Sequence, residues 1–173
     1  MKQNINGVKI FKSKIFADNR GFFKEIYKKK FLKNKQLIFH CASSSKKNVL
    51  RGLHHQTKNP QGKFLTVVKG RIFDVLVDLR KNSKTFGKYF SIILSEKSYS
   101  SIYVPEGFAH GFCGLDKENI VYYCCTSYRE KNHEIGILWN DPDLKIKWPI
   151  KKPILSKKDS CNISFREYCD KYN

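Results

Sequence analysis

The densest polar cluster in the chain is a run that ends in two histidines and a glutamine. It reads Arg51-Gly52-Leu53-His54-His55-Gln56 and closes an otherwise apolar stretch. A guanidinium and two imidazoles are costly to bury without partners, so the run is a candidate site. An imidazole has an unperturbed pKa of about 6.5, which suits a general base. The plainer alternative is a histidine satisfied within the core, and these residues alone leave both open.

A metal site is another use for clustered histidines, but the spacing disfavours it. Neighbouring residues of a strand point to opposite faces, so His54 and His55 cannot easily bind one ion. His110 could join either of them, yet no acidic residue stands at ligand spacing. We therefore expect no metal.

The same alternation constrains Arg51 and His54, which are three positions apart. A regular strand would place them on opposite faces. If both line one site, the strand must bulge between them, and Gly52 permits a bulge there.

Two further segments could add polar groups to the same site. In the segment 104–112, V-P-E-G-F-A-H-G-F, the glycines around His110 would let the backbone approach a ligand, although a structural loop is the alternative. In Ile120–Thr126, Tyr122 and Tyr123 are adjacent. Core packing accounts for one of them, while the other can turn its phenol inward as a donor.

Short segments with strand character dominate the rest of the chain. They are Val8–Phe16, Leu50–His55, Phe64–Val68, Arg71–Leu79, Tyr89–Leu94, Ser101–Val104 and Val121–Thr126. Within Arg71–Leu79, Phe73, Val75 and Val77 should share one face. Turn residues separate the strands, and helices are expected only near Lys28–Lys35 and Phe165–Tyr172. Many short strands without a linker or repeat predict one all-β domain, for which a double-sheet jelly roll fits best.

Length, composition and charge exclude several classes of protein. The 173 residues suffice for one domain with a core, and no run approaches the roughly 18 apolar residues of a membrane helix. Because no secretory signal is evident, we expect a cytoplasmic protein with six reduced cysteines. The net charge of +19 could indicate nucleic acid, but the lysines are scattered. We expect neither a nucleic acid nor a membrane as partner, and a small anionic ligand instead.

The motifs, taken in order, resemble those of the dTDP-4-dehydrorhamnose 3,5-epimerases. The matching segments are D-N-R-G-F-F-K-E (18–25), V-L-R-G-L-H-H-Q (49–56), Q-G-K (61–63), F-D-V-L-V-D-L-R (73–80), V-P-E-G-F-A-H-G-F (104–112), I-L-W-N-D-P (137–142) and L-S-K-K-D (155–159). The resemblance implies a cupin-type double-stranded β-helix, or jelly roll, with a few short helices. It implies epimerisation at C3 and C5 of a nucleotide-linked 4-keto-6-deoxy hexose, with no metal or organic cofactor.

The resemblance also implies an organisation for the chain. Residues 1–173 would form a single domain that is usually a homodimer. Within it, the amino-terminal segment 1–48 would contribute to the dimer and to the partner's site, and 160–173 would be a carboxy-terminal tail.

Roles follow by resemblance at matching positions. His54 corresponds to the base, Asp159 to the carboxylate that orients it, and Tyr123 to the proton donor on the opposite face of the sugar. Lys63 and His110 would lie near the 4-keto oxygen. The positions that would contact the nucleotide or the sugar, including one aromatic ring on the base, are Phe23, Arg20, Glu25, Arg51, Gln56, Glu134 and Lys158.

The chemistry suits these residue types. Protons on C3 and C5 are acidic because each carbon adjoins the C4 ketone, and the enolate left behind needs a cation or donor at its oxygen. Inversion takes a proton from one face of the ring and returns one to the other. A base and an acid must therefore flank the sugar.

One segment departs from the family pattern. Where a Gln-Asp-Asn-like triplet usually contacts the nucleotide, this chain has Phe39-His40-Cys41. A GDP- or UDP-linked substrate and a C3-only epimerase therefore stay open beside the dTDP-linked 3,5-epimerase. The alternative from another class is a non-catalytic basic jelly-roll module that binds nucleotides or nucleic acid. Such a module has no need of His54, Tyr123 and Asp159 together.

Overall fold

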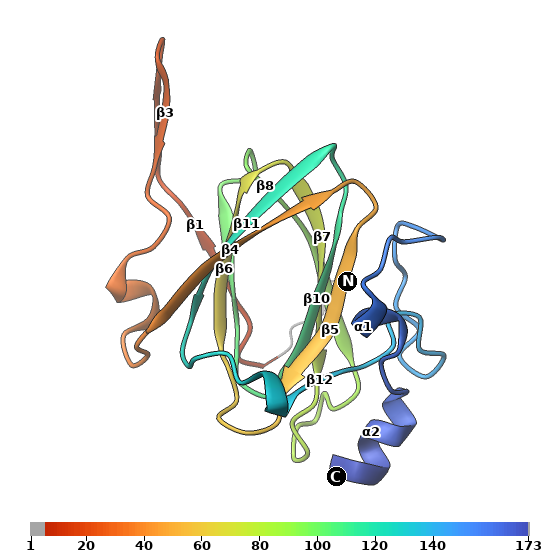
Figure 1. Cartoon of the computed structure of the whole chain (residues 1–173). Coiled ribbons are helices and arrows are strands. Elements are labelled where there is room, and N and C mark those ends of the chain that lie inside the picture. Colours follow the sequence, from red (N-terminus) through yellow and green to blue (C-terminus); the bar gives the residue numbers. More distant parts are fainter. Residues whose placement is uncertain (1–5, 173) are drawn as a thin grey trace.

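Two facing five-stranded sheets form the body of the molecule (Figure 1). The computed structural model describes residues 6–172. Its strands are β1 (Lys9–Lys12), β2 (Ile15–Asp18), β3 (Gly21–Lys24), β4 (Phe39–Lys46), β5 (Leu50–Gln56), β6 (Lys63–Lys69), β7 (Arg71–Asp78), β8 (Tyr89–Ser95), β9 (Ser100–Val104), β10 (Phe108–Gly114), β11 (Glu118–Cys125) and β12 (Glu134–Gly136). Its helices are the 3₁₀ turns η1 (Lys29–Leu32) and η2 (Lys131–His133) and the short α-helices α1 (Lys157–Ser160) and α2 (Phe165–Tyr172).

The strand order mixes distant parts of the chain in each sheet. The first sheet runs β1-β9-β6-β11-β4 and the second runs β12-β5-β10-β7-β8, while β2 and β3 form a separate hairpin. Neighbouring strands within the two sheets pair antiparallel. This double-sheet arrangement confirms the predicted all-β jelly-roll class.

The two expected helices and most strands lie where the patterns predicted them, with differences at the ends, whereas η2 and α1 were not expected. α2 coincides with Phe165–Tyr172, and η1 occupies only part of Lys28–Lys35. The expected strand Val8–Phe16 is divided into β1 and β2, because Ser13 N leaves the strand pattern and donates to Tyr99 O at 2.7 Å. None of the described helices is long and apolar enough to cross a bilayer.

Strand β7 contributes side chains to two hydrophobic cores, one on each face of its sheet. Its inward residues Ile72 and Leu76 pack with β6, β9 and β11 between the sheets. Phe73, Val75 and Val77 share its other face, as predicted, and this face packs under the carboxy-terminal residues, with Val75 and Val77 buried and Phe73 partly buried. Burial of each such side chain contributes about 1.5–3 kcal/mol relative to exposure. The two-sided burial fixes the register of the second sheet.

The outer face of each sheet is covered by chain that is not in that sheet. Ile26, Phe31 and Leu32 lie over Phe64 of the first sheet, and the segment from Ile137 to Tyr168 covers the second. β1 and β4 belong to the first sheet itself. Of the described part of segment 1–48, the β2–β3 hairpin stands apart and projects away from the sheets (Figure 1).

Candidate active site

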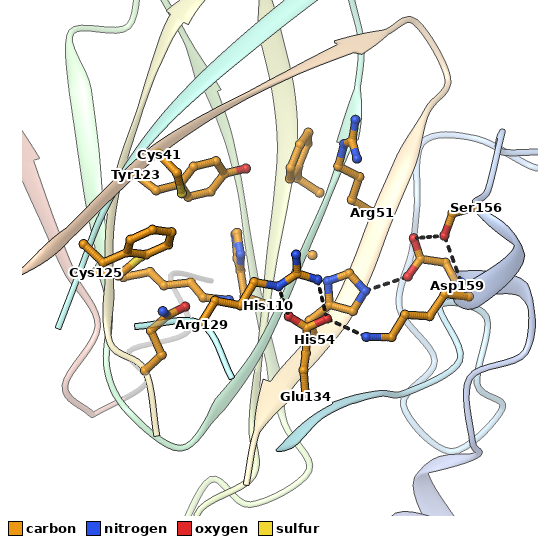
Figure 2. Close-up of a pocket in the computed structure, with 16 residues that line it drawn as sticks. Cys41, Arg51, His54, His110, Tyr123, Cys125, Arg129, Glu134, Ser156 and Asp159 are labelled. Atoms are coloured by element: carbon orange, nitrogen blue, oxygen red, sulfur yellow. Dashed lines mark hydrogen bonds and ion pairs between the residues drawn. The ribbon is translucent and has the colours of Figure 1, made fainter. Parts of the chain in front are cut away.

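A cavity of about 320 Å³ opens between the inner faces of the two sheets (Figure 2). One wall comes from β4, β6 and β11, and the other comes from β5 and β10 together with α1 and the start of β12. Most of its lining is polar or charged, unlike the apolar core that fills the rest of the space between the sheets.

The wall from the first sheet consists of two rows of cross-strand neighbours. In one row, Tyr123 of β11 lies between Cys41 of β4 and Leu65 of β6. In the next row, Cys125 lies between Phe39 and Lys63. Residues two apart on a strand share a face, so both rows point into the cavity.

Strand β4 was not predicted as a strand, because its inward residues line this cavity. Phe39, Cys41, Ser43 and Ser45 face inward and alternate with exposed residues along Phe39–Lys46. Small and polar side chains at these positions leave room for a ligand. They also remove the apolar alternation by which strands are recognised.

The wall from the second sheet pairs His54 with His110, and Arg51 with Phe112. The register between β5 and β10 shifts between these two pairs. The shift is the predicted bulge, and it places Arg51 and His54 in one cavity although they are three positions apart.

Gly52 makes the bulge possible because its backbone has φ +114° and lies against β10. A Cβ at this position would be 2.6 Å from Gly111 Cα and 2.7 Å from His110 O. In the same way, a Cβ on Gly111 would meet Arg51 O at 2.7 Å. Gly52 and Gly111 therefore allow β5 and β10 to approach each other closely.

We expect Gly52→Ala to destabilise the protein by roughly 2–4 kcal/mol, because it combines an unfavourable φ with a backbone clash. Gly21→Ala is a matched control, since Gly21 also has positive φ but a methyl group added there would have nothing within 4 Å. Urea unfolding of both variants gives the comparison. Equal stability of the two variants would refute the close approach as the cause.

His54 is held by a carboxylate from a distant part of the chain. Its Nε2 lies 2.6 Å from Asp159 Oδ1 (Figure 2). Asp159 lies in α1, where Ser156 Oγ donates to Oδ2 at 2.9 Å and accepts from Asp159 N. Burial raises the pKa of Asp159, but hydrogen bonds from His54 and Ser156 and the charge of His54 outweigh it, so the net pKa is lowered.

The charge of Asp159 assigns the tautomer of His54. An ionised carboxylate can only accept, so Nε2 carries the proton and donates it to Asp159. The lone pair of the neutral ring is then on Nδ1. His54 can accept a proton there while its other nitrogen is fixed by the carboxylate.

The two tyrosines of β11 face opposite ways. Tyr123 lines the cavity, and its hydroxyl lies 3.1 Å from Ser43 Oγ. Tyr122 faces the outer side, where its hydroxyl lies 2.8 Å from His40 Nδ1. Burial raises the pKa of Tyr123, so this phenol stays protonated and is available as a donor.

Lys63 and His110 line the same cavity as His54 and Tyr123. Burial lowers the pKa of Lys63, and no ion pair to its ammonium is present among the described residues. His110 is buried and donates from Nε2 to Asp74 Oδ1 at 2.7 Å. An amine and an imidazole thus line the same cavity.

Glu134 joins two cations at the cavity edge. Arg129 binds it through Nε at 2.7 Å and Nη2 at 2.9 Å, and Lys158 Nζ lies 2.5 Å from Oε1 (Figure 2). Burial opposes the charge, but hydrogen bonds from Arg129 and Lys158 outweigh it and lower the pKa of Glu134 to about 2. Arg129 lies outside every motif, so no sequence pattern pointed to it. The other lining residues that were not predicted include Gln61, Phe112, Cys125 and Ser156.

Four predicted site residues lie outside the cavity. Gln56 is outside this cavity, and its amide is bonded to loop backbone at Asn59 O, Tyr128 O and Glu130 N. Arg20, Phe23 and Glu25 lie on or just after the β2–β3 hairpin, with Arg20 paired to Asp18. The structure of one chain does not bring these four residues to the cavity.

The adjacent histidines point in opposite directions. His54 faces the cavity, whereas His55 packs against Tyr168 with ring centroids 6.0 Å apart. Among residues 6–172 there is no group of three or more His, Cys, Asp or Glu side chains suited to hold a metal ion.

Comparison with known proteins places the site in a family. The sequence model for dTDP-4-dehydrorhamnose 3,5-epimerase matches residues 2–167. The chain belongs to the dTDP-4-dehydrorhamnose 3,5-epimerase family. The predicted resemblance is therefore confirmed.

Individual relatives of the family agree in sequence and fold. The dTDP-4-dehydrorhamnose 3,5-epimerase of Shigella flexneri is 42% identical, and the match covers 92% of this chain and 91% of the relative. The Neisseria gonorrhoeae enzyme of the same name is 45% identical over 88% of this chain, which spans about half (48%) of that relative. A crystal structure of the dTDP-6-deoxy-D-glucose-3,5-epimerase of Legionella pneumophila Philadelphia 1, in complex with dTDP-4-keto-L-rhamnose, has a TM-score of 0.90 at 37% identity. That match covers 96% of this chain and 92% of the other.

Proposed function

We propose that this protein epimerises C3 and C5 of dTDP-4-keto-6-deoxyglucose, giving the 4-keto-L-rhamnose configuration. The observation that carries the proposal is the placement of His54 and Tyr123 on the inner faces of opposite sheets, where they line one cavity. A sugar ring between them would have a base on one face and an acid on the other, as inversion requires.

The steps follow from the atoms that line the cavity. His54 Nδ1 removes the proton from C3 or C5, and Asp159 stabilises the imidazolium that forms. The pair of electrons moves into the C4 carbonyl, and Lys63 in its protonated form, beside His110, stabilises the enolate oxygen. Tyr123 then donates its phenolic proton to the same carbon from the other face, which inverts that centre.

Proton NMR in D2O tests the proposal directly. The purified protein with dTDP-4-keto-6-deoxyglucose should replace the protons on both C3 and C5 with deuterium and form product inverted at both carbons. Loss of the C3 signal alone would indicate a C3-only epimerase. GDP- and UDP-linked substrates assayed in parallel identify the nucleotide. No exchange with any of the three would favour the non-catalytic binding module.

We further propose that the enzyme is a homodimer in which the β2–β3 hairpin of each chain reaches the cavity of its partner. Two observations support this: the hairpin projects away from its own sheets, and Phe16, Phe22 and Phe23 on it are 57%, 62% and 66% exposed. Exposed rings of this kind are typical of a surface that another molecule covers. Arg20, Phe23 and Glu25 would then contact nucleotide held in the partner subunit.

Hybrid dimers test the exchange of hairpins. Alone, chains carrying His54→Ala should be inactive and chains carrying Arg20→Ala should be weakly active, and co-refolding should restore activity. In a hybrid, one cavity combines an intact His54 with an intact hairpin from the other chain. If each hairpin serves its own chain, no cavity in the mixture is intact and activity stays low. Light scattering after size exclusion reports the oligomeric state independently.

We also propose that the protein is located in the cytoplasm. All six cysteines are free thiols, which suits the reducing cytoplasm.

A further inference from the structure

One part of the cavity wall offers almost no hydrogen-bonding capacity. Phe39 and Cys125 are cross-strand neighbours, and Cys41 lies opposite Tyr123 in the adjacent row. The two thiols lie close enough to affect each other's ionisation. Thiols are weak donors and weak acceptors, and a phenyl ring has no polar atom. A substrate group placed here therefore meets a surface that is close to apolar.

The thiols stay neutral at physiological pH, which keeps this surface apolar. Burial raises the pKa of Cys125 to about 12, with Lys63 acting in the opposite direction. Burial likewise raises the pKa of Cys41. Neither thiol has a task in the proton transfers assigned to His54 and Tyr123.

The position of Lys63 determines which part of the sugar meets this surface. Lys63 is the direct cross-strand neighbour of Cys125. If the C4 oxygen faces Lys63, as the proposed function requires, a substituent on a carbon next to C4 reaches Cys125 and Phe39. The two such substituents are the C3 hydroxyl and the C5 methyl group, whose carbon is C6.

The chemistry of the wall discriminates between these two substituents. A hydroxyl group against Cys125 and Phe39 would lose its bonds to water without gaining a comparable partner. A methyl group loses no hydrogen bond there and gains from burial. We propose that Phe39, Cys41 and Cys125 form a subsite for the C6 methyl group, which orients the sugar and makes the enzyme selective for 6-deoxy sugars.

Binding of two stable nucleotide sugars tests this subsite, which rests on the proposed function but needs no turnover. dTDP-6-deoxyglucose and dTDP-glucose differ only by a hydroxyl on C6. Calorimetry should show the 6-deoxy compound binding to the wild-type protein roughly tenfold more tightly, the cost expected for one unpaired buried hydroxyl. The double variant Cys41→Ser, Cys125→Ser places hydroxyls in the wall, so the preference should fall to near unity or invert.

Cys124→Ser is the matched control, because Cys124 lies on the same strand but packs on the outer face. Its preference for the 6-deoxy compound should equal that of the wild type, and thermal unfolding verifies that all variants fold. Equal affinities in the wild type, or an unchanged preference in the double variant, would overturn the subsite. If neither compound binds the wild-type protein, both the subsite and the proposed function are wrong. Deuterium exchange together with equal affinities would overturn the subsite alone.

Discussion

His54→Ala should abolish deuterium incorporation from D2O at both C3 and C5 while the protein stays folded. One imidazole, with Nδ1 free and Nε2 held 2.6 Å from Asp159, would serve both carbons, so a single substitution removes both exchanges. Removing a general base typically costs about 10²–10⁴ in rate. The loss should be at the upper end, since Tyr123 is protonated and Glu134 is held by Arg129 and Lys158, so neither group can readily replace the base.

His55→Ala is the control for this experiment. It removes an imidazole from the next residue, but from the opposite face of β5, where His55 contacts Tyr168. Exchange per folded molecule should be close to wild type. Near wild-type exchange in His54→Ala would disprove the base assignment, and loss of exchange only in His55→Ala would mean that the strand register is wrong.

Tyr123→Phe should separate proton removal from inversion. The substitution deletes one oxygen and preserves the packing of the ring, so His54 can still form the enolate. Reprotonation from the far face should fail, and inverted product should fall by about 10²–10⁴. Deuterium exchange with retained configuration can persist, because His54 can return a solvent-derived proton to the face from which it came. NMR distinguishes retained from inverted product at each carbon.

Tyr122→Phe provides the comparison, because it deletes the same atom from the adjacent residue. Its hydroxyl contacts His40 on the outer side of the first sheet, so inversion should be unaffected. If Tyr122→Phe alone loses inverted product, the acid is misassigned. If neither variant does, the proton comes from another donor.

The fold was predictable where one face of a segment is apolar. β7 and α2 have strong periodicity because each packs on the core, and both lie where the sequence placed them. β4 and β10 were missed as strands for two different reasons. β4 lines the cavity with small polar groups. β10 is buried on all sides and contains glycines where other strands approach it.

The part of the site that lies in local motifs, or that depends on the alternation of side chains along a strand, was predictable. His54 and Tyr123 were assigned by resemblance at matching motif positions, since the residue types alone left Tyr122 open as well. The bulge at Gly52 follows from strand alternation once Arg51 and His54 are placed in one site. Arg129 was not predictable, because only the folded loop brings it to Glu134 and the cavity. Gln56 shows the converse, since a polar residue beside a motif can serve loop backbone. Arg20 and Phe23 belong to the hairpin and do not line the cavity of their own chain.

The position of Asp159 late in the sequence bears on the order in which the chain is synthesised and folds. Asp159 is synthesised 105 residues after His54, when every strand of both sheets has already left the ribosome's active centre. The segment that carries it is attached to the outside of the second sheet through the parallel bridge of Val49 with Ile154. The strands of both sheets are therefore synthesised before the carboxylate that contacts His54. A growing or shortened chain that ends before α1 lacks the carboxylate that contacts His54, so the proposed base is oriented only after the last segments have docked.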